Sequence, residues 1–186
     1  MYFFVPIILR RPIWSHALSV IGFWSLAFFY PLNGVHHFLL SSIPESVQYG
    51  AIVSTMAVEV VVTTVVVNFF ATMWGNGKAL VTNLPIRWFY TGMVFYFITC
   101  LQCAFHTTLT FQEIIHFTDW VPGHAHMVML GVFGFWVIGA TTWLWPRLTG
   151  NEWYDRRLNH LQYWLTLIGL GIMIIDLTGA GLVHGF

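Results

Sequence analysis

The sequence predicts an all-α integral membrane protein, a bundle of five transmembrane helices with the N-terminus inside and the C-terminus outside. Of the 186 residues, 58% are hydrophobic and only 8% are charged, whereas a soluble domain usually has about 25% charged residues. Five apolar segments each reach the roughly 20 residues that a helix needs to cross a bilayer. All seven Lys and Arg residues fall where one side of the membrane would lie.

The predicted helices follow one another without a long linker, a low-complexity tract or an internal repeat, so residues 1–186 form one transmembrane domain. Because backbone polar groups must be satisfied internally in lipid, the apolar segments are expected to be helical. The expected spans are residues 14–35, 48–73, 86–110, 120–146 and 160–183.

The basic residues set the orientation, because Lys and Arg gather in cytoplasmic loops. They lie before the first span, between the second and third, and between the fourth and fifth: Arg10, Arg11, Lys78, Arg87, Arg147, Arg156 and Arg157. Segments 38–47 and 111–119 have none, so they face outward. The formal net charge of zero argues against a nucleic-acid partner.

Two pairs of histidines are predicted to lie at one depth, near the outer face. The first span runs outward, and His36 and His37 lie at its outer end. The fourth span runs inward from Trp120, so His124 and His126 fall in its first two turns. Polar groups inside a membrane are costly and tend to mark function, so this convergence indicates a cofactor site.

His36 and His37 are adjacent, and a regular helix would splay their side chains by roughly 100°. Pro31 and Gly34 precede them and can loosen the helix end, so that both rings reach one ion. Imidazole suits copper, iron or zinc. Two ligands are too few, so at least one more must come from elsewhere.

His124 and His126 are two positions apart, which separates them by roughly 200° around a helix. They are therefore expected to bind two haems, one on each side, as axial ligands. Gly123 and Ala125 are small enough to let a macrocycle approach. The remaining candidates are interpreted as polar or small residues in helix contacts: His16, His106, His160, His184, and Cys100 with Cys103, whose alternative is a redox pair or half a metal site.

These residues, in this order, resemble the core subunit of the haem–copper oxygen reductases, above all the C family, the cbb3-type cytochrome c oxidases. The similarity runs over nearly the whole chain, from "YFFVP" through "YPLNGVHH", "HFTDWVPGHAH" and "WPRLTG". The family core has more helices than this chain, which resembles only about the seventh to the eleventh.

The resemblance implies two haems b, one low-spin and one high-spin, and a copper ion, CuB. It assigns His36 and His37 to CuB, His124 to the high-spin haem facing CuB, and His126 to the low-spin haem. It also assigns a catalytic role to Tyr30, which lies six residues before His36. The phenol would supply an electron and a proton when the O–O bond breaks.

The resemblance implies that Tyr96 belongs to a path that brings protons from the inner side of the membrane. Ser19 lies nearer the inner side on the first span and could extend this path toward it. Glu59, a carboxylate inside the second span, is a further candidate. The alternative for Tyr96 is aromatic packing, and for Ser19 a helix contact. His116 and Asp119, in the outer segment above the haem ligands, are candidates to hold haem propionates; Asp119 is equally a helix N-cap.

The chain also departs from the family. The helix with the third CuB histidine and the second axial ligand of the low-spin haem are absent, and Gln102 stands where the family has a glutamate. The core is either split between chains or represented here by a fragment. We therefore expect another membrane chain to bring the missing helices and ligands, beside cytochrome c-type haem subunits.

The resemblance implies part of the catalytic core of a respiratory oxidase in the cytoplasmic (inner) membrane of a prokaryote. Such an enzyme reduces oxygen to water with electrons from cytochrome c and takes up protons; this chain alone is expected to be inactive. The alternative is a nitric oxide reductase with non-haem iron at His36 and His37, since those relatives carry a glutamate close to Glu59. A third hypothesis is a haem-bearing electron-transfer subunit without substrate chemistry.

Overall fold

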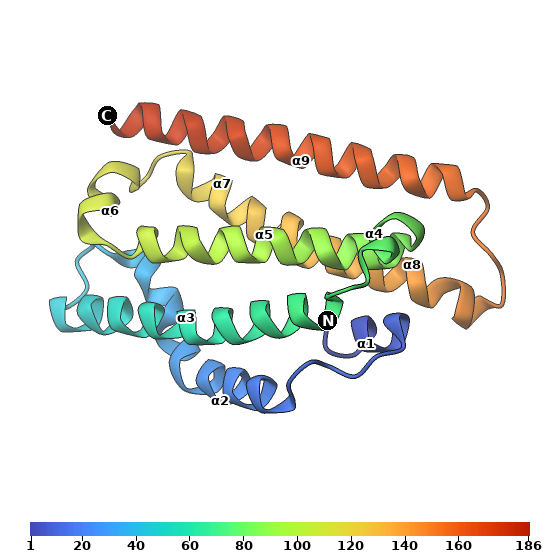
Figure 1. Cartoon of the computed structure of the whole chain (residues 1–186). Helices are drawn as coiled ribbons and strands as arrows, with labels where there is room; N and C mark the ends of the chain where they lie inside the picture. Colours follow the sequence, from blue (N-terminus) through green and yellow to red (C-terminus); the bar gives the residue numbers. More distant parts are fainter.

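The computed structural model describes all 186 residues and contains helices joined by short connections, with no strand (Figure 1). Five helical segments are long and apolar enough to cross a membrane: His16–Phe38, Glu45–Met73, Leu84–His106, Trp120–Thr149 and Arg156–Gly185. Each overlaps one predicted span. The prediction of an all-α membrane protein with five spans is therefore confirmed.

Two of the five spans, the first and the fourth, are composed of more than one regular element. The elements are α1 (Phe4–Leu9), α2 (His16–Asn33), the 3₁₀ turn η1 (Gly34–Phe38), α3 (Glu45–Met73), α4 (Gly77–Thr82), α5 (Leu84–His106), α6 (Leu109–Ile115), α7 (Trp120–His126), the π-helix η2 (Met127–Gly134), α8 (Phe135–Thr149) and α9 (Arg156–Gly185).

The third and fourth spans differ from the prediction in detail. The third was predicted to reach residue 110, but α5 ends at His106, where the Thr107 N–H donates to the Cys103 carbonyl at 3.1 Å. The short helix α6 then occupies part of the segment that was predicted as an outer loop. The fourth span contains the π-helical segment, which hydrophobic periodicity does not predict.

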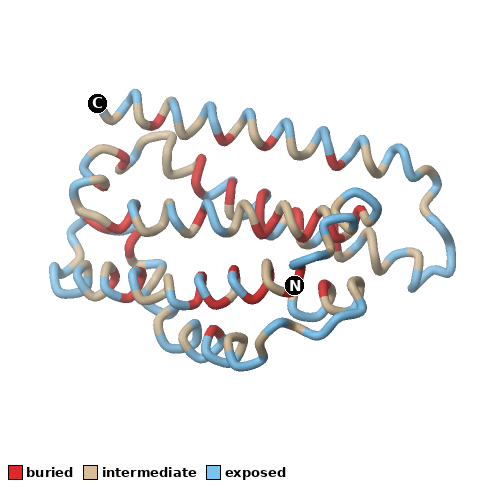
Figure 2. The backbone as a smooth tube through the Cα atoms, viewed as in Figure 1, coloured by how far each residue is buried: buried red, intermediate tan, exposed pale blue.

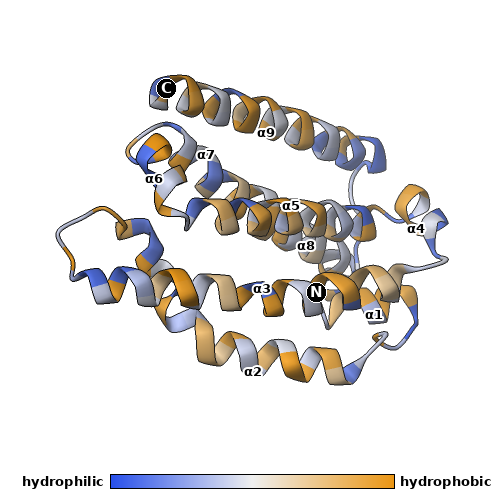
Figure 3. Cartoon of the chain, turned by 60° about the vertical axis from the view of Figure 1, so that its left-hand side comes forward, coloured by the Kyte–Doolittle hydropathy of each residue, from blue (hydrophilic) through white to orange (hydrophobic).

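The helices form an open stack. α2 packs on α3, α3 on α5, and α5 on α8 and η2, while α9 lies over α6, α7 and η2 (Figure 1). α2 and α9 are the outermost helices, and most of their surface is exposed (Figure 2). Their exposed faces are largely apolar (Figure 3), which fits contact with lipid or with further membrane helices.

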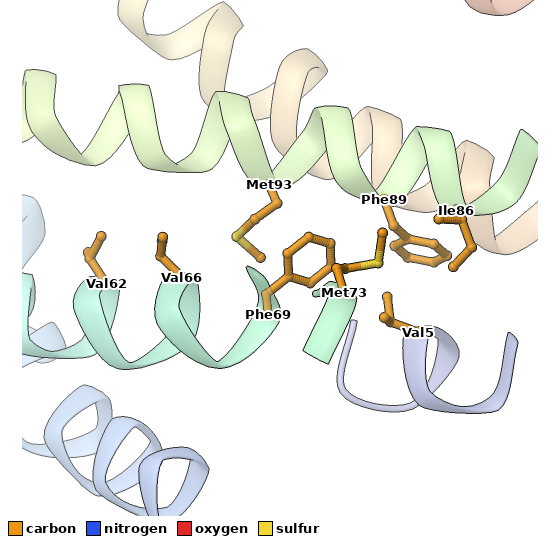
Figure 4. Close-up of a cluster of buried hydrophobic side chains, with 8 residues drawn as sticks. All are labelled: Val5, Val62, Val66, Phe69, Met73, Ile86, Phe89 and Met93. Carbon is orange, nitrogen blue, oxygen red and sulfur yellow. The ribbon is translucent and has the colours of Figure 1, made fainter. Parts of the chain in front are cut away.

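One core cluster joins α1, α3 and α5. Val5, Phe69, Met73, Phe89 and Met93 belong to it, and Figure 4 shows these side chains directed toward one another. A second cluster joins α5 to the fourth span and α9 through Trp88, Phe135 and Tyr163, whose rings meet edge to face. In lipid, this close packing replaces hydrophobic exclusion from water as the stabilising contribution.

Small residues permit the closest helix contacts. A Cβ on Gly139 of α8 would lie 2.9 Å from the Trp88 Cβ and 3.3 Å from the Pro85 carbonyl oxygen of α5. The backbone of Gly181 on α9 likewise lies against Trp120 at the start of α7. These glycines set the distances at which α8 and α9 pack, and so help to position the fourth span.

The seven basic residues lie at one end of the stack, opposite the end that carries η1 and α6 (Figure 1). Arg11 donates to the carbonyl of Trp74 at 2.8 Å, and Arg87 donates to those of Leu80 and Val81 at 2.7 Å. These arginines therefore satisfy main-chain carbonyls where helices end. The common end agrees with the expected orientation, in which all basic residues face inward.

Candidate functional site

His36 and His37 lie in the 3₁₀ turn η1, directly after α2 ends at Asn33. Their ring centroids are 4.2 Å apart. The expected loosening of the helix end is confirmed, because the α-helical pattern stops there. His36 is 1% exposed, whereas His37 is exposed.

The hydrogen bonds of His36 fix which of its nitrogens is free. Its Nδ1 lies 3.0 Å from Oγ1 of Thr55, and that hydroxyl donates to the Ala51 carbonyl at 2.8 Å. Since the hydroxyl has only one hydrogen, its oxygen accepts the bond from His36, whose proton is on Nδ1. Nε2 then keeps its lone pair, and it is buried without a partner. A buried free imidazole nitrogen is what a metal ligand requires.

His124 and His126 lie on α7 and face opposite sides. His124 is 3% exposed and directed into the protein, whereas His126 is exposed on the other side. The prediction that they point apart is confirmed. His126 Nδ1 donates to the Pro122 carbonyl at 2.7 Å, and His124 Nδ1 donates to Oε1 of Gln102 at 3.0 Å.

Both α7 histidines thus have Nδ1 occupied. Metal-ligating histidines commonly hold their second ring nitrogen in this way, which fixes the tautomer and the ring orientation. Gln102 therefore has an identifiable structural role as the acceptor for His124. The Cys103 thiol lies 3.4 Å from Nε2 of His124 and satisfies its lone pair, and neither cysteine forms a disulfide.

Gly123 was expected to let a macrocycle approach the helix, and this expectation is wrong. A Cβ at this position would lie 3.0 Å from the Leu177 Cβ and 3.2 Å from Cγ2 of Thr178, so Gly123 faces α9. Its small size serves a helix contact and gives a macrocycle no space. The reason is its place on the helix, one residue from His124 and turned toward the neighbouring span.

His106, interpreted from the sequence as a packing residue, lies among the proposed ligands. Its ring centroid is 5.6 Å from that of His36, 5.2 Å from that of His37 and 5.5 Å from that of His124. The sequence did contain a signal for this position, because the third span runs outward and His106 ends it at the depth of the other histidines.

Tyr30 lies on α2 and is 58% exposed, on the side away from the core. The prediction assumed a continuous helix from Tyr30 to His37. In the structure α2 ends at Asn33 and the 3₁₀ turn η1 follows. Four α-helical steps and three 3₁₀ steps still leave the two side chains within about 40° of each other and about 12 Å apart along the axis.

The candidate proton-path residues lie on three helices. Ser19 is half-buried on α2, and its hydroxyl donates to the His16 carbonyl at 2.7 Å. Tyr96 of α5 packs beside Trp136, with ring centroids 5.9 Å apart. Glu59 of α3 is half-buried. The structure brings Glu59 near α5 and leaves Ser19 apart from both.

His116 and Asp119 lie in the outer connection between α6 and α7. His116 Nδ1 is 3.2 Å from Oε1 of Gln112. Asp119 occupies the position before α7, but its side chain makes no capping bond. Its carboxylate lies 3.3 Å from Nδ1 of His184, near the end of α9. Asp119 therefore occupies the N-cap position that was predicted, but it does not make the side-chain hydrogen bond of an N-cap.

A model of the family described as "Cytochrome C and Quinol oxidase polypeptide I" matches residues 1–186. The chain belongs to this family. It is 28% identical over its whole length to cytochrome c oxidase subunit 1 of Rhodobacter capsulatus, and 28% identical over its whole length to the cbb3-type cytochrome c oxidase subunit CcoN1 of Stutzerimonas stutzeri. A cytochrome c oxidase subunit 1 homolog of Agrobacterium tumefaciens is 28% identical over 98% of the chain.

The chain spans 35%, 39% and 34% of these three relatives, respectively. It therefore corresponds to about a third of a family core. Members of the cytochrome c and quinol oxidase family hold haem and copper, and the buried Nε2 of His36 and the held Nδ1 atoms of His124 and His126 fit ligands of such groups. No three His, Cys, Asp or Glu side chains form a group that could hold a metal ion within this chain.

Proposed function

We propose that this chain forms part of the catalytic core of a respiratory haem–copper oxidase, which reduces oxygen to water with electrons from cytochrome c and takes up protons. The observation that carries the proposal is the pair on α7. His124 and His126 face opposite sides, and each has Nδ1 held by an acceptor. Nε2 of His126 is left for a ligand bond, whereas Nε2 of His124 meets the Cys103 thiol at 3.4 Å, a weak donor that a ligand would replace. A packing histidine has no need of this arrangement, which two axial haem ligands require.

Each histidine has a defined part in the proposal. His126 would hold the low-spin haem b and His124 the high-spin haem b, while His36 and His37 would hold the copper ion CuB. When bound, the haems and copper supply the electron transfer and oxygen chemistry. Gln102 keeps His124 in the tautomer with Nε2 free, and Thr55 does the same for His36.

The remaining candidates would move protons and hold the periphery. Tyr30 would give an electron and a proton as the O–O bond breaks. Tyr96, Glu59 and Ser19 would carry protons from the inner side. In the outer connection, His116 and Asp119 are proposed to hold haem propionates. His116 contacts Gln112 of α6, and Asp119 contacts His184 of α9.

The chain would act with partners in a prokaryotic cytoplasmic (inner) membrane. Its span of about a third of its relatives supports a second membrane chain, or a longer parent chain, with the missing helices and ligands. His37 and Tyr30 are exposed, and such helices would cover them. Cytochrome c-type haem subunits are proposed as the electron donors.

Nitric oxide reduction is the second candidate function. It is favoured by Glu59, a carboxylate within a membrane span that contacts no basic side chain. In that case the ion at His36 and His37 would be non-haem iron. A haem-bearing electron carrier is disfavoured because it has no use for a buried, free imidazole nitrogen on His36.

The deciding experiment is metal and haem analysis of the complex purified from membranes with its co-purifying chains. Copper beside two haems supports the oxidase, and iron in excess of haem without copper supports nitric oxide reduction. Haem with no further metal contradicts both and leaves the electron carrier. Oxygen consumption and nitric oxide consumption by the same preparation provide an independent check.

A further inference from the structure

A cleft of about 430 Å³ lies at the end of the stack that carries the basic residues, where α1, the start of α5 and the end of α8 meet (Figure 1). Phe4 on α1 contacts Trp143 on α8, with ring centroids 5.7 Å apart, and so joins two walls of the cleft. The residues that line this inner cleft have no part in the proposed function: Ile7, Ile8, Arg10, Asn83, Trp143 and Arg147. Arg147 belongs to the sequence WPRLTG, which the haem and copper chemistry leaves without a role.

Arg10 and Arg147 bring two positive charges to the inner cleft, and neither has a carboxylate partner. Both side chains are exposed. The only ion pair between an arginine and a carboxylate in the chain is Arg156 with Glu152, at 3.4 Å. None of the residues that line the inner cleft is acidic. A concave site with charges of one sign raises the local concentration of the opposite ion, so the ligand that this site favours is an anion.

The donors of the inner cleft are held in place by contacts within the chain. The guanidinium carbon of Arg147 lies 4.0 Å from the centroid of the Trp143 ring, and its Nη1 donates to the Trp143 carbonyl at 2.6 Å. These contacts fix the guanidinium group and leave its other N–H groups free. Asn83 accepts from the Ile86 N–H through Oδ1 at 3.1 Å, so its amide nitrogen is left to donate. Guanidinium and amide donors in one cleft suit the oxygens of a phosphate group.

A second cleft of about 290 Å³ lies next to the inner cleft and shares Asn83, Trp143 and Arg147 with it. Its carboxylate, Glu152, is paired with Arg156, so the charge of Arg147 stays uncompensated. Further polar side chains line this second cleft, namely Thr82, Thr142, Asn159 and His160. Such groups can both donate to and accept from hydroxyl groups that are attached to a phosphate.

The inner cleft also has an apolar wall. Ile7 is 45% exposed and Ile8 is half-buried, both on the short helix α1 that precedes the first span. Tryptophans gather at this end of the stack, where the rings of Trp145 and Trp153 lie 6.0 Å apart, and tryptophan is enriched where a membrane meets water. A small inorganic anion has no use for two isoleucines. A molecule with an anionic head and apolar tails matches both kinds of wall.

We propose that the inner cleft binds an anionic phospholipid of the membrane leaflet on the side of the basic residues. Arg10, Arg147 and Asn83 donate to the phosphate, headgroup hydroxyls lie in the second cleft, and the acyl chains lie along Ile7 and Ile8. Basic pockets between transmembrane helices on the cytoplasmic side hold headgroups of this kind. A zwitterionic phospholipid brings a cation of its own, which the arginines repel, so it binds more weakly. The inference uses neither haem nor copper and does not depend on the proposed function.

The test is a lipid titration of the complex that is purified from membranes with its co-purifying chains and stripped of lipid by detergent. Native mass spectrometry counts bound phosphatidylglycerol, with phosphatidylcholine in a parallel series, and phosphatidylglycerol should bind more tightly. Arg10→Gln and Arg147→Gln should each weaken its binding about tenfold, because each removes hydrogen bonds to a charged group. Arg157→Gln is the matched control, since Arg157 lies at the same end and lines neither cleft; it should bind the lipid as the parent does.

The Arg10 variant keeps the test decisive if Arg147→Gln destabilises the end of α8, because the exposed Arg10 side chain makes no ion pair within the chain. Equal binding of the two lipids by the parent overturns the inference, and so does unchanged phosphatidylglycerol binding in Arg10→Gln, which is the result if a neighbouring chain covers the cleft. Inorganic phosphate in large excess provides the last comparison. If it displaces the lipid, the cleft holds a free anion and the inference fails, whereas lipid that stays bound supports it.

Discussion

At the scale of single residues, the opposite faces of His124 and His126 give distinct expectations for two substitutions. His126→Ala should remove the low-spin haem, and His124→Ala should remove or mis-ligate the high-spin haem, because each Nε2 faces a different side. Visible and EPR spectra of the purified complex measure this. His16→Ala, at the opposite end of the stack, should keep both signals. Loss of the same haem in both variants would refute the two-sided assignment.

Gln102 allows a test of the bond that orients His124. Gln102→Leu removes the acceptor for Nδ1, and loss of such a partner typically costs about 10–100-fold in metal affinity or activity. Gln102→Glu keeps an oxygen acceptor of the same size and should retain the haem. Haem retention during detergent dilution compares the two variants. Equal retention in both would mean that the 3.0 Å contact does not support the ligand.

Tyr30→Phe should keep both haems and the copper, because no ligand is lost, yet nearly abolish oxygen turnover. The phenol is proposed to supply an electron and a proton that the haems and copper alone do not provide. Oxygen consumption is measured beside haem and metal content. Tyr49→Phe, another exposed tyrosine on the neighbouring helix α3, serves as the control. Full oxygen turnover in the Tyr30 variant would exclude this role.

At the scale of helices, the α5–α8 contact depends on Gly139. Gly139→Ala places a Cβ against Trp88 and the Pro85 carbonyl, and overpacking of this kind costs typically about 1–3 kcal/mol. Gly169→Ala, at an open position of α9, should be neutral or slightly stabilising, because Ala favours a helix over Gly by about 1 kcal/mol. Thermal unfolding in detergent compares the two. Equal midpoints would show that α8 can move away at no cost.

The five spans could be predicted because hydrophobic length and the positions of Lys and Arg are local properties of the chain. The opposed faces of His124 and His126 follow from helix geometry alone. His106 was not recognised, because a single histidine at a helix end gains meaning only from neighbours on other helices. Gly123 was misassigned for a related reason, since its face is set by the packing of α9.

At the scale of the whole molecule, the open stack predicts dependence on further membrane helices. Expression of this chain alone should give no stable species with two haems, because the proposed low-spin haem would have a single ligand here and the outermost helix α2 packs chiefly on α3. Haem stoichiometry after size-exclusion chromatography measures this. Co-expression with the missing family helices should restore two haems. Two tightly bound haems on the isolated chain would contradict the expectation.

The π-helical segment Met127–Gly134 begins directly after the histidine pair and ends where α8 begins. A π turn takes up more residues than an α turn, so every side chain beyond it is rotated from the direction that a regular helix would give. The registers of the two halves of the fourth span are therefore set separately. One half can be placed by the hydrogen bonds of its histidines and the other by contact with Trp88, so that neither contact has to be weakened for the other.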